Sequence, residues 1–160
     1  MMQTERLMVT TPSDREIAMS RTFDAPRNLV YDAYTKPELL KRWLGVFGGW
    51  SFAVCEVDLK VGGKYRFVWR KDGHEMGMGG IYREIVKHER LVSTEKFDDP
   101  WYEGEAVSTT LFEEKTGKTT LTIMVRYDSK EIRDAVLQSP METGVAASFD
   151  VLAELLAKSA

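Results

Sequence analysis

The chain has 160 residues, a net charge of −3 and 43% hydrophobic residues, a composition typical of one soluble globular domain. No run of Lys and Arg could follow a phosphate backbone, and no apolar segment reaches the roughly 18 residues that cross a bilayer. Nucleic-acid binding and membrane insertion are therefore not expected. Residues 1–20 hold no signal-peptide core and Cys55 is the only cysteine, so a disulfide framework is excluded and a cytoplasmic location is expected.

The first segment with a clear pattern begins at residue 16. Residues 1–14 show no periodicity and are expected to form an N-terminal arm, followed by one domain over residues 15–158. Residues 16–23 alternate, with Ile17, Met19 and Phe23 on one face. This alternation predicts a first strand.

Two prolines predict two short helices after this strand. Pro26 and Pro37 each stand where a helix is expected to begin, because proline favours the first helical turn. Gly45 and the Gly48-Gly49 pair are expected to end the second helix in a loop.

A run of strands follows. The alternation is clearest where Tyr65, Phe67 and Trp69 share one face, which indicates a sheet with one buried and one wet side. The glycines within residues 77–80 are expected to mark a bend that curls the sheet around a helix. The predicted strands cover residues 52–59, 64–70, 75–86 and 91–97, and two more are marked by Val107, Thr109 and Leu111 and by Leu121, Ile123, Val125 and Tyr127.

The C-terminal segment is predicted to be helical. Ser129 can cap a short helix that runs to Gln138, and Pro140 opens a longer helix that reaches about Ala157. The order of elements predicts an α+β fold in which a curved antiparallel sheet packs its concave face on the last helix. The expected inner stripe of this helix comprises Met141, Val145, Ser148, Leu152 and Leu155.

Several short segments occur in a fixed order along the chain: Phe23-Asp24-Ala25-Pro26, Pro37-Glu38-Leu39-Leu40 with Trp43, Gly62-Gly63, residues 80–85, residues 89–92 and the final helix. Taken together, they resemble the SRPBCC superfamily of START-like, birch-pollen-allergen-like proteins. Within it, the chain resembles the branch of homologues of the activator of the 90-kDa heat-shock protein ATPase. The resemblance covers about residues 16–156 and implies a helix-grip fold, with about six to seven strands wrapped around a long C-terminal helix.

The resemblance also implies a cavity between the sheet and the last helix, which favours a small apolar or aromatic ligand. Aromatic and methionine side chains could line this cavity or simply fill the core, and Ser148 could orient a ligand or allow tight packing. The expected lining residues are Trp43, Phe67, Trp69, Met78, Tyr82, Phe97, Ser148 and Leu152. Trp50, Trp101 and Tyr102 are expected to form a lid or an interface. The alternative for Trp101 and Tyr102 is that they fold back as a plug.

Catalytic groups are scarce. His74 and His88 are interpreted as surface residues, Cys55 as an inert thiol, and the spacing of His and Cys offers no zinc site. Glu95 is the candidate for an acid/base role, since period two would turn it inward together with Leu91 and Phe97. A bulge that turns it outward, or a pairing with Arg126 or Arg83, would remove that role.

Three functions follow as hypotheses. The first is a non-enzymatic protein that holds an apolar or aromatic ligand and needs no metal or cofactor. The second is an interaction protein, with a chaperone or a stress-linked protein as its partner. The third is a cyclase or hydratase that uses Glu95 with Tyr82. A monomer and a homodimer are both compatible with the sequence.

Overall fold

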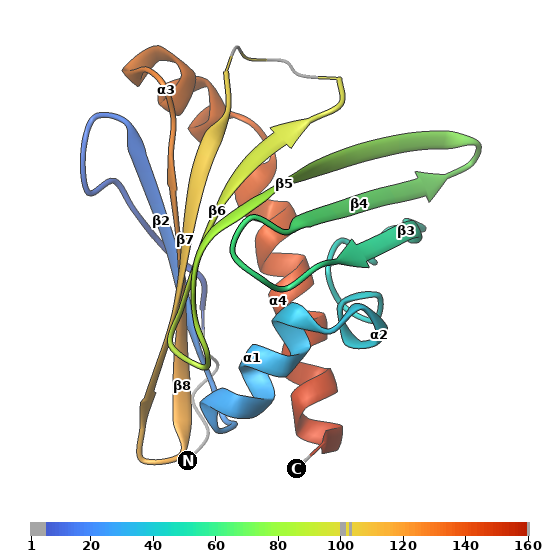
Figure 1. Ribbon diagram of the computed structural model, residues 1–160, viewed down its shortest axis with the longest axis vertical. Coiled ribbons are helices and arrows are strands. Elements are labelled where there is room, and N and C mark those ends of the chain that lie inside the picture. The colour runs from blue at the N-terminus through green and yellow to red at the C-terminus, as the bar shows by residue number, and fades with distance from the viewer. Residues whose placement is uncertain (1–5, 100–101, 103, 160) are drawn as a thin grey trace.

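The computed structural model describes residues 6–99, 102 and 104–159, and an antiparallel sheet that curls around a long helix dominates it (Figure 1). Eight strands form in this described part of the chain, against the six to seven that were expected, and the helix-grip architecture is confirmed. The strands are β1 (Met8–Thr10), β2 (Glu16–Phe23), β3 (Ser51–Val57), β4 (Lys64–Lys71), β5 (His74–Val86), β6 (Arg90–Phe97), β7 (Ala106–Lys115) and β8 (Lys118–Arg126). The helices are α1 (Arg27–Thr35), α2 (Pro37–Leu40), α3 (Lys130–Gln138) and α4 (Met141–Ser159).

The strand order is β1-β2-β8-β7-β6-β5-β4-β3, and every neighbouring pair is antiparallel. The first long strand, β2, therefore pairs with the last strand, β8, while α1 and α2 lead the chain across to the opposite edge at β3. In Figure 1, β2, β7 and β8 stand upright and β3 and β4 run across, and α4 passes along the hollow that this curvature creates. Among the described residues, no helix combines the length and apolar character needed to span a membrane.

The short strand β1 lies within the segment expected to form an arm. Met8, Val9 and Thr10 pair with Ser20, Met19 and Ala18 of β2, which extends the sheet by one edge strand. Three residues are too few to show a sequence period. This strand depends on the free edge of β2, which offers unpaired backbone groups.

The second helix is shorter than the sequence suggested. It covers only Pro37–Leu40, and the chain then continues as turns to Gly45, whose φ of +72° suits glycine. Within these turns Trp43 is fully buried, and its indole N–H donates a hydrogen bond of 2.8 Å to the Ala33 carbonyl. This contact ties the turn to α1 and satisfies a polar group that burial would otherwise leave unpaired.

The glycines of β5 allow two strands to approach closely where the sequence predicted a bend. A Cβ atom on Gly80 would lie 1.9 Å from the Thr94 carbonyl oxygen of β6. The regular β5–β6 ladder is interrupted here, and Thr94 forms other bonds instead: its carbonyl accepts from the Tyr65 hydroxyl at 2.7 Å, and its hydroxyl accepts from the Ile81 N–H at 2.9 Å. The missing side chain thus lets β4, β5 and β6 close around the interior.

The last two helices begin where the sequence predicted. Ser129 caps α3, because its hydroxyl accepts the Ile132 N–H at 3.2 Å. On α4, Ser148, Leu152 and the unanticipated Phe149 are almost completely buried against the sheet side of the molecule. Phe149 packs edge-on against Phe23 of β2, with 5.6 Å between the ring centres, and so anchors the middle of α4 to the first long strand.

Candidate functional site

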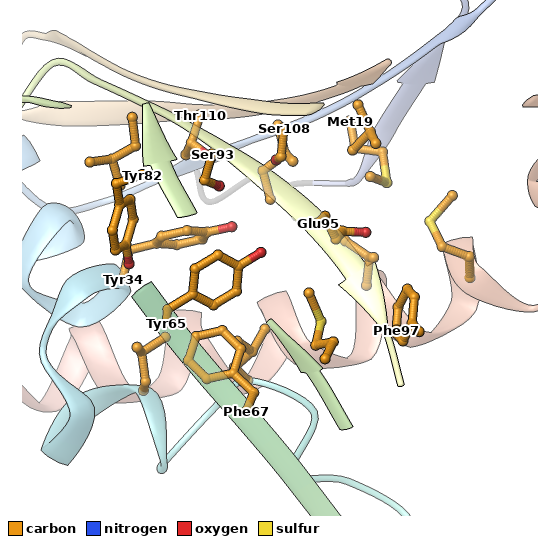
Figure 2. Close-up of a pocket in the computed structure, with 18 of the residues that line it drawn as sticks. Met19, Tyr34, Tyr65, Phe67, Tyr82, Ser93, Glu95, Phe97, Ser108 and Thr110 are labelled. Atoms are coloured by element: carbon orange, nitrogen blue, oxygen red, sulfur yellow. The ribbon is translucent and has the colours of Figure 1, made fainter. Parts of the chain in front are cut away.

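A cavity of about 250 Å³ lies between the concave face of the sheet and the first half of α4 (Figure 2). Most of its walls are apolar, and its polar groups come mainly from β6 and β7. Its lining residues are Met19, Tyr34, Leu40, Leu44, Tyr65, Phe67, Trp69, Met78, Tyr82, Leu91, Ser93, Glu95, Phe97, Ser108, Thr110, Ile123, Val125, Tyr127, Met141 and Val145.

One wall of the cavity is an aromatic row on β4. Tyr65, Phe67 and Trp69 occupy alternate positions of β4, so all three rings lie on the face that lines the cavity, and neighbouring ring centres lie 5.1 and 5.8 Å apart. The Trp69 indole N–H donates to the Leu44 carbonyl at 2.9 Å, and Met78 of β5 is the cross-strand partner of Phe67. These contacts hold the rings in place, so the wall exists before any ligand arrives.

The opposite wall carries hydroxyl groups. Ser93 of β6 lies directly across from Ser108 of β7, and Thr110 follows two residues later on the same face. Figure 2 shows these side chains and Glu95 on one side of the cavity, with Tyr34, Tyr65 and Phe67 on the other. The strand that Val107, Thr109 and Leu111 marked in the sequence therefore points its smaller, more polar residues inward, and those three lie half-buried on the other face.

Glu95 extends into the cavity from β6, near the end of the polar wall. Its side chain is half-buried and keeps some contact with solvent because the cavity itself reaches it. Within the described residues it forms neither a hydrogen bond nor an ion pair, and Arg83 and Arg126 are exposed. Burial disfavours the charged form and raises the pKa of Glu95 to about 7.

The negative charge of Glu95 acts on four tyrosines. Burial raises the pKa of Tyr34 to about 12, and the Glu95 charge adds a smaller contribution in the same direction. Burial and, after it, the negative charge of Glu95 raise the pKa of Tyr65, Tyr102 and Tyr127, that of Tyr102 to about 12. These phenols therefore stay protonated at neutral pH. They add polar but uncharged groups to the lining of the cavity and of the adjoining hollow.

A larger hollow of about 910 Å³ adjoins the cavity and is called its mouth below. Glu95, Phe97, Tyr127 and Met141 line both spaces, so the carboxylate stands at the junction. The mouth opens between the ends of β5 and β6 and the junction of α3 with α4, where Ser139 and Pro140 also line it.

A side pocket of about 270 Å³ adjoins the cavity on the α2 side. Trp43 and Trp50 line it together with Ser148 of α4, and it shares Trp69 and Met78 with the main cavity. The Ser148 hydroxyl accepts the Gly45 N–H at 3.0 Å, so this hydroxyl ties α4 to the turn after α2.

The residues singled out from the sequence fall into distinct places. Phe67, Trp69, Met78, Tyr82, Phe97 and the candidate acid Glu95 line the main cavity; Trp43, Trp50 and Ser148 line the side pocket; Tyr102 lines the mouth. Leu152 is fully buried in the core and is outside the lining of these three spaces. Trp101 lies outside the described residues.

Much of the polar wall was not predicted from the sequence. Ser93 could have been found by extending the period-two pattern from Glu95 back along the same strand. Ser108 and Thr110 gave no such signal, because the larger apolar residues of that strand alternate with them. Tyr34 reaches the cavity from a helix, where strand periodicity has no bearing.

A strongly curved antiparallel sheet, a long C-terminal helix in its hollow and a cavity between them define a helix-grip protein of the SRPBCC type. Residues 24–157 match the family model described as Activator of Hsp90 ATPase homolog 1-like protein, and the chain belongs to this family.

Solved structures of bacterial proteins share the whole fold. A protein from Rhodobacter sphaeroides is 29% identical, with a TM-score of 0.90 over 96% of this chain and 99% of that chain. A protein from Chromobacterium violaceum is 28% identical, with a TM-score of 0.74 over 90% and 98% of the two chains. An HSP90 activator from Plasmodium falciparum is 26% identical, with a TM-score of 0.55 over 70% and 72%. Comparison with curated proteins finds no match.

Proposed function

We propose that the protein binds a small, mainly apolar molecule in the cavity between the sheet and α4. The observation that carries the proposal is the cavity of about 250 Å³ with an aromatic row on one wall and hydroxyl groups on the other. Apolar walls with a few polar groups are typical of small-molecule sites. Protein interiors are close-packed, and a molecule that fills this space would gain contacts with all of its walls.

Native mass spectrometry before and after denaturing extraction tests this proposal. The expected result is a small molecule that co-purifies with the folded protein and is released when the protein is unfolded. Ser108→Phe would place a ring inside the cavity, whereas Thr109→Phe places the same ring on the other face of the same strand. We expect the first variant to lose the ligand and the second to retain it.

Two results would contradict the proposal. One is a Ser108→Phe variant that folds and still carries the molecule. The other is a wild-type protein that carries no molecule and binds no small aromatic probe. Circular dichroism spectra of both variants would show whether the fold is retained.

Contact with a chaperone is a second candidate, favoured by the family and by the Plasmodium structure described as an HSP90 activator. The test is the rate of ATP hydrolysis by purified Hsp90 with and without an excess of this protein. An increased rate would support the candidate, and an unchanged rate together with no binding would remove it. A cytoplasmic location belongs to both candidates and is supported by the single cysteine, Cys55.

A further inference from the structure

We propose that the ligand of the cavity carries a protonated amine and that Glu95 is its counter-ion. This inference rests on the proposed function, because it names the chemical class that the same cavity accepts. The ligand would be an amphipathic amine, with its ammonium group at the junction of cavity and mouth and its apolar part against the β4 aromatic row.

The first support is the position of Glu95. Its carboxylate reaches into an apolar cavity and forms no ion pair or hydrogen bond within the described part of the chain. A carboxylate in such surroundings is costly unless it gains a partner of opposite charge. The protein supplies no such partner from the described cavity walls, so a bound cation is the group that would complete the site.

The second support is the distribution of charge along the entry route. Glu95 is the one charged side chain among the described residues that line the main cavity, so an anionic ligand would meet repulsion and no cation. In the mouth, Arg66 pairs with Asp98, and Glu75 pairs with Arg70 at its rim, which leaves Asp99 and Glu95 as an excess of negative charge. A negatively charged mouth favours the approach of cations.

The third support is the set of groups around the carboxylate. An ammonium group has three N–H donors, and the hydroxyls of Ser93 and Ser108 lie on the same wall as the Glu95 oxygens. The rings of Phe97 and Tyr127 also line the junction, and aromatic faces attract cations. A neutral alcohol could use one acceptor here but would leave the carboxylate charge uncompensated.

Three probes with one ring system separate the possible head groups: 2-naphthylmethylamine, 2-naphthylmethanol and 2-naphthoate. Their dissociation constants at pH 7.5 would be measured by isothermal titration calorimetry on the wild-type protein, Glu95→Gln and Glu113→Gln. Glu113 lies on the exposed end of β7, so its variant makes the same charge change away from the cavity. Ser108→Phe reports whether a probe binds inside.

We expect the amine to bind at least about tenfold more tightly than the alcohol, as a charge-assisted hydrogen bond implies, and the naphthoate to bind most weakly. Glu95→Gln should weaken amine binding about tenfold or more and change alcohol binding less than about threefold. Glu113→Gln should match the wild type, and Ser108→Phe should abolish binding of the amine.

The inference is overturned if the alcohol or the naphthoate binds as tightly as the amine, or if Glu95→Gln keeps the preference for the amine. It is also overturned if Ser108→Phe still binds the amine, because the probe would then sit on the acidic mouth alone. If none of the three probes binds the wild-type protein, the proposed function fails together with the inference.

Discussion

The raised pKa of Glu95 predicts a dependence of stability on pH that Glu95→Gln should remove. Burial raises the pKa of this side chain from 4.5 to about 7. Below pH 4.5 the folded and unfolded chains both hold the proton. Between pH 4.5 and 7 the unfolded chain releases the proton while the folded chain keeps it, so the free energy of unfolding falls as the pH rises. Above pH 7 the loss is complete.

The size of the effect follows from the two pKa values. The span from 4.5 to about 7, at about 1.36 kcal/mol for each pH unit, corresponds to about 3 kcal/mol of stability lost at alkaline pH. Between pH 5 and pH 8 the expected change is about 2 to 3 kcal/mol. Glutamine has nearly the same shape and no charge, so the advantage of the variant over the wild type should grow by this amount.

Urea unfolding at pH 5 and pH 8, followed by tryptophan fluorescence, measures this difference. The wild type, Glu95→Gln and Glu113→Gln would be compared, since subtraction cancels the titration of all other groups. The ionisable neighbours that line the cavity from other elements, Tyr34, Tyr65, Tyr82 and Tyr127, have pKa values raised above the range of the experiment. If Glu95→Gln differs from the wild type by the same amount at both pH values, the carboxyl group is not buried as described and the reasoning is refuted.

Two further predictions concern the packing that shapes the cavity. Gly80→Ala should lower the free energy of unfolding by about 2 kcal/mol or more, because its Cβ would lie 1.9 Å from the Thr94 carbonyl oxygen, whereas Gly144→Ala on α4 meets only the Phe47 ring at 3.5 Å and should be neutral or stabilising. Equal free energies of unfolding for Gly80→Ala and Gly144→Ala, measured by urea unfolding, would contradict the close approach of β5 and β6. Trp43→Phe should cost about 1 to 2 kcal/mol in urea unfolding, because the Ala33 carbonyl loses the indole N–H; an unchanged midpoint would show that this hydrogen bond contributes nothing.

Much of the fold could be predicted from local patterns in the sequence. Residues 16–23 alternate, with Ile17, Met19 and Phe23 on one face, and form β2 with those same limits. Ser129 caps a helix that ends at Gln138 as predicted. The aromatic alternation on β4 likewise identified the face that lines the cavity. Such local patterns predict the structure correctly because periodicity and capping depend on residues that are close in sequence.

The cavity itself was decided by tertiary structure. Period two placed Glu95 on the same strand face as Leu91. Which described side chains surround it depends on β4, β7 and α4, which lie far apart in the sequence. The Ser93–Ser108 pair arises from the register of β6 against β7, and Tyr34 joins it only because α1 packs under the sheet. The curvature of the sheet, the strand register and the packing of the helices determine which residues, distant in sequence, line the same cavity. These features depend on contacts throughout the core and not on any one segment.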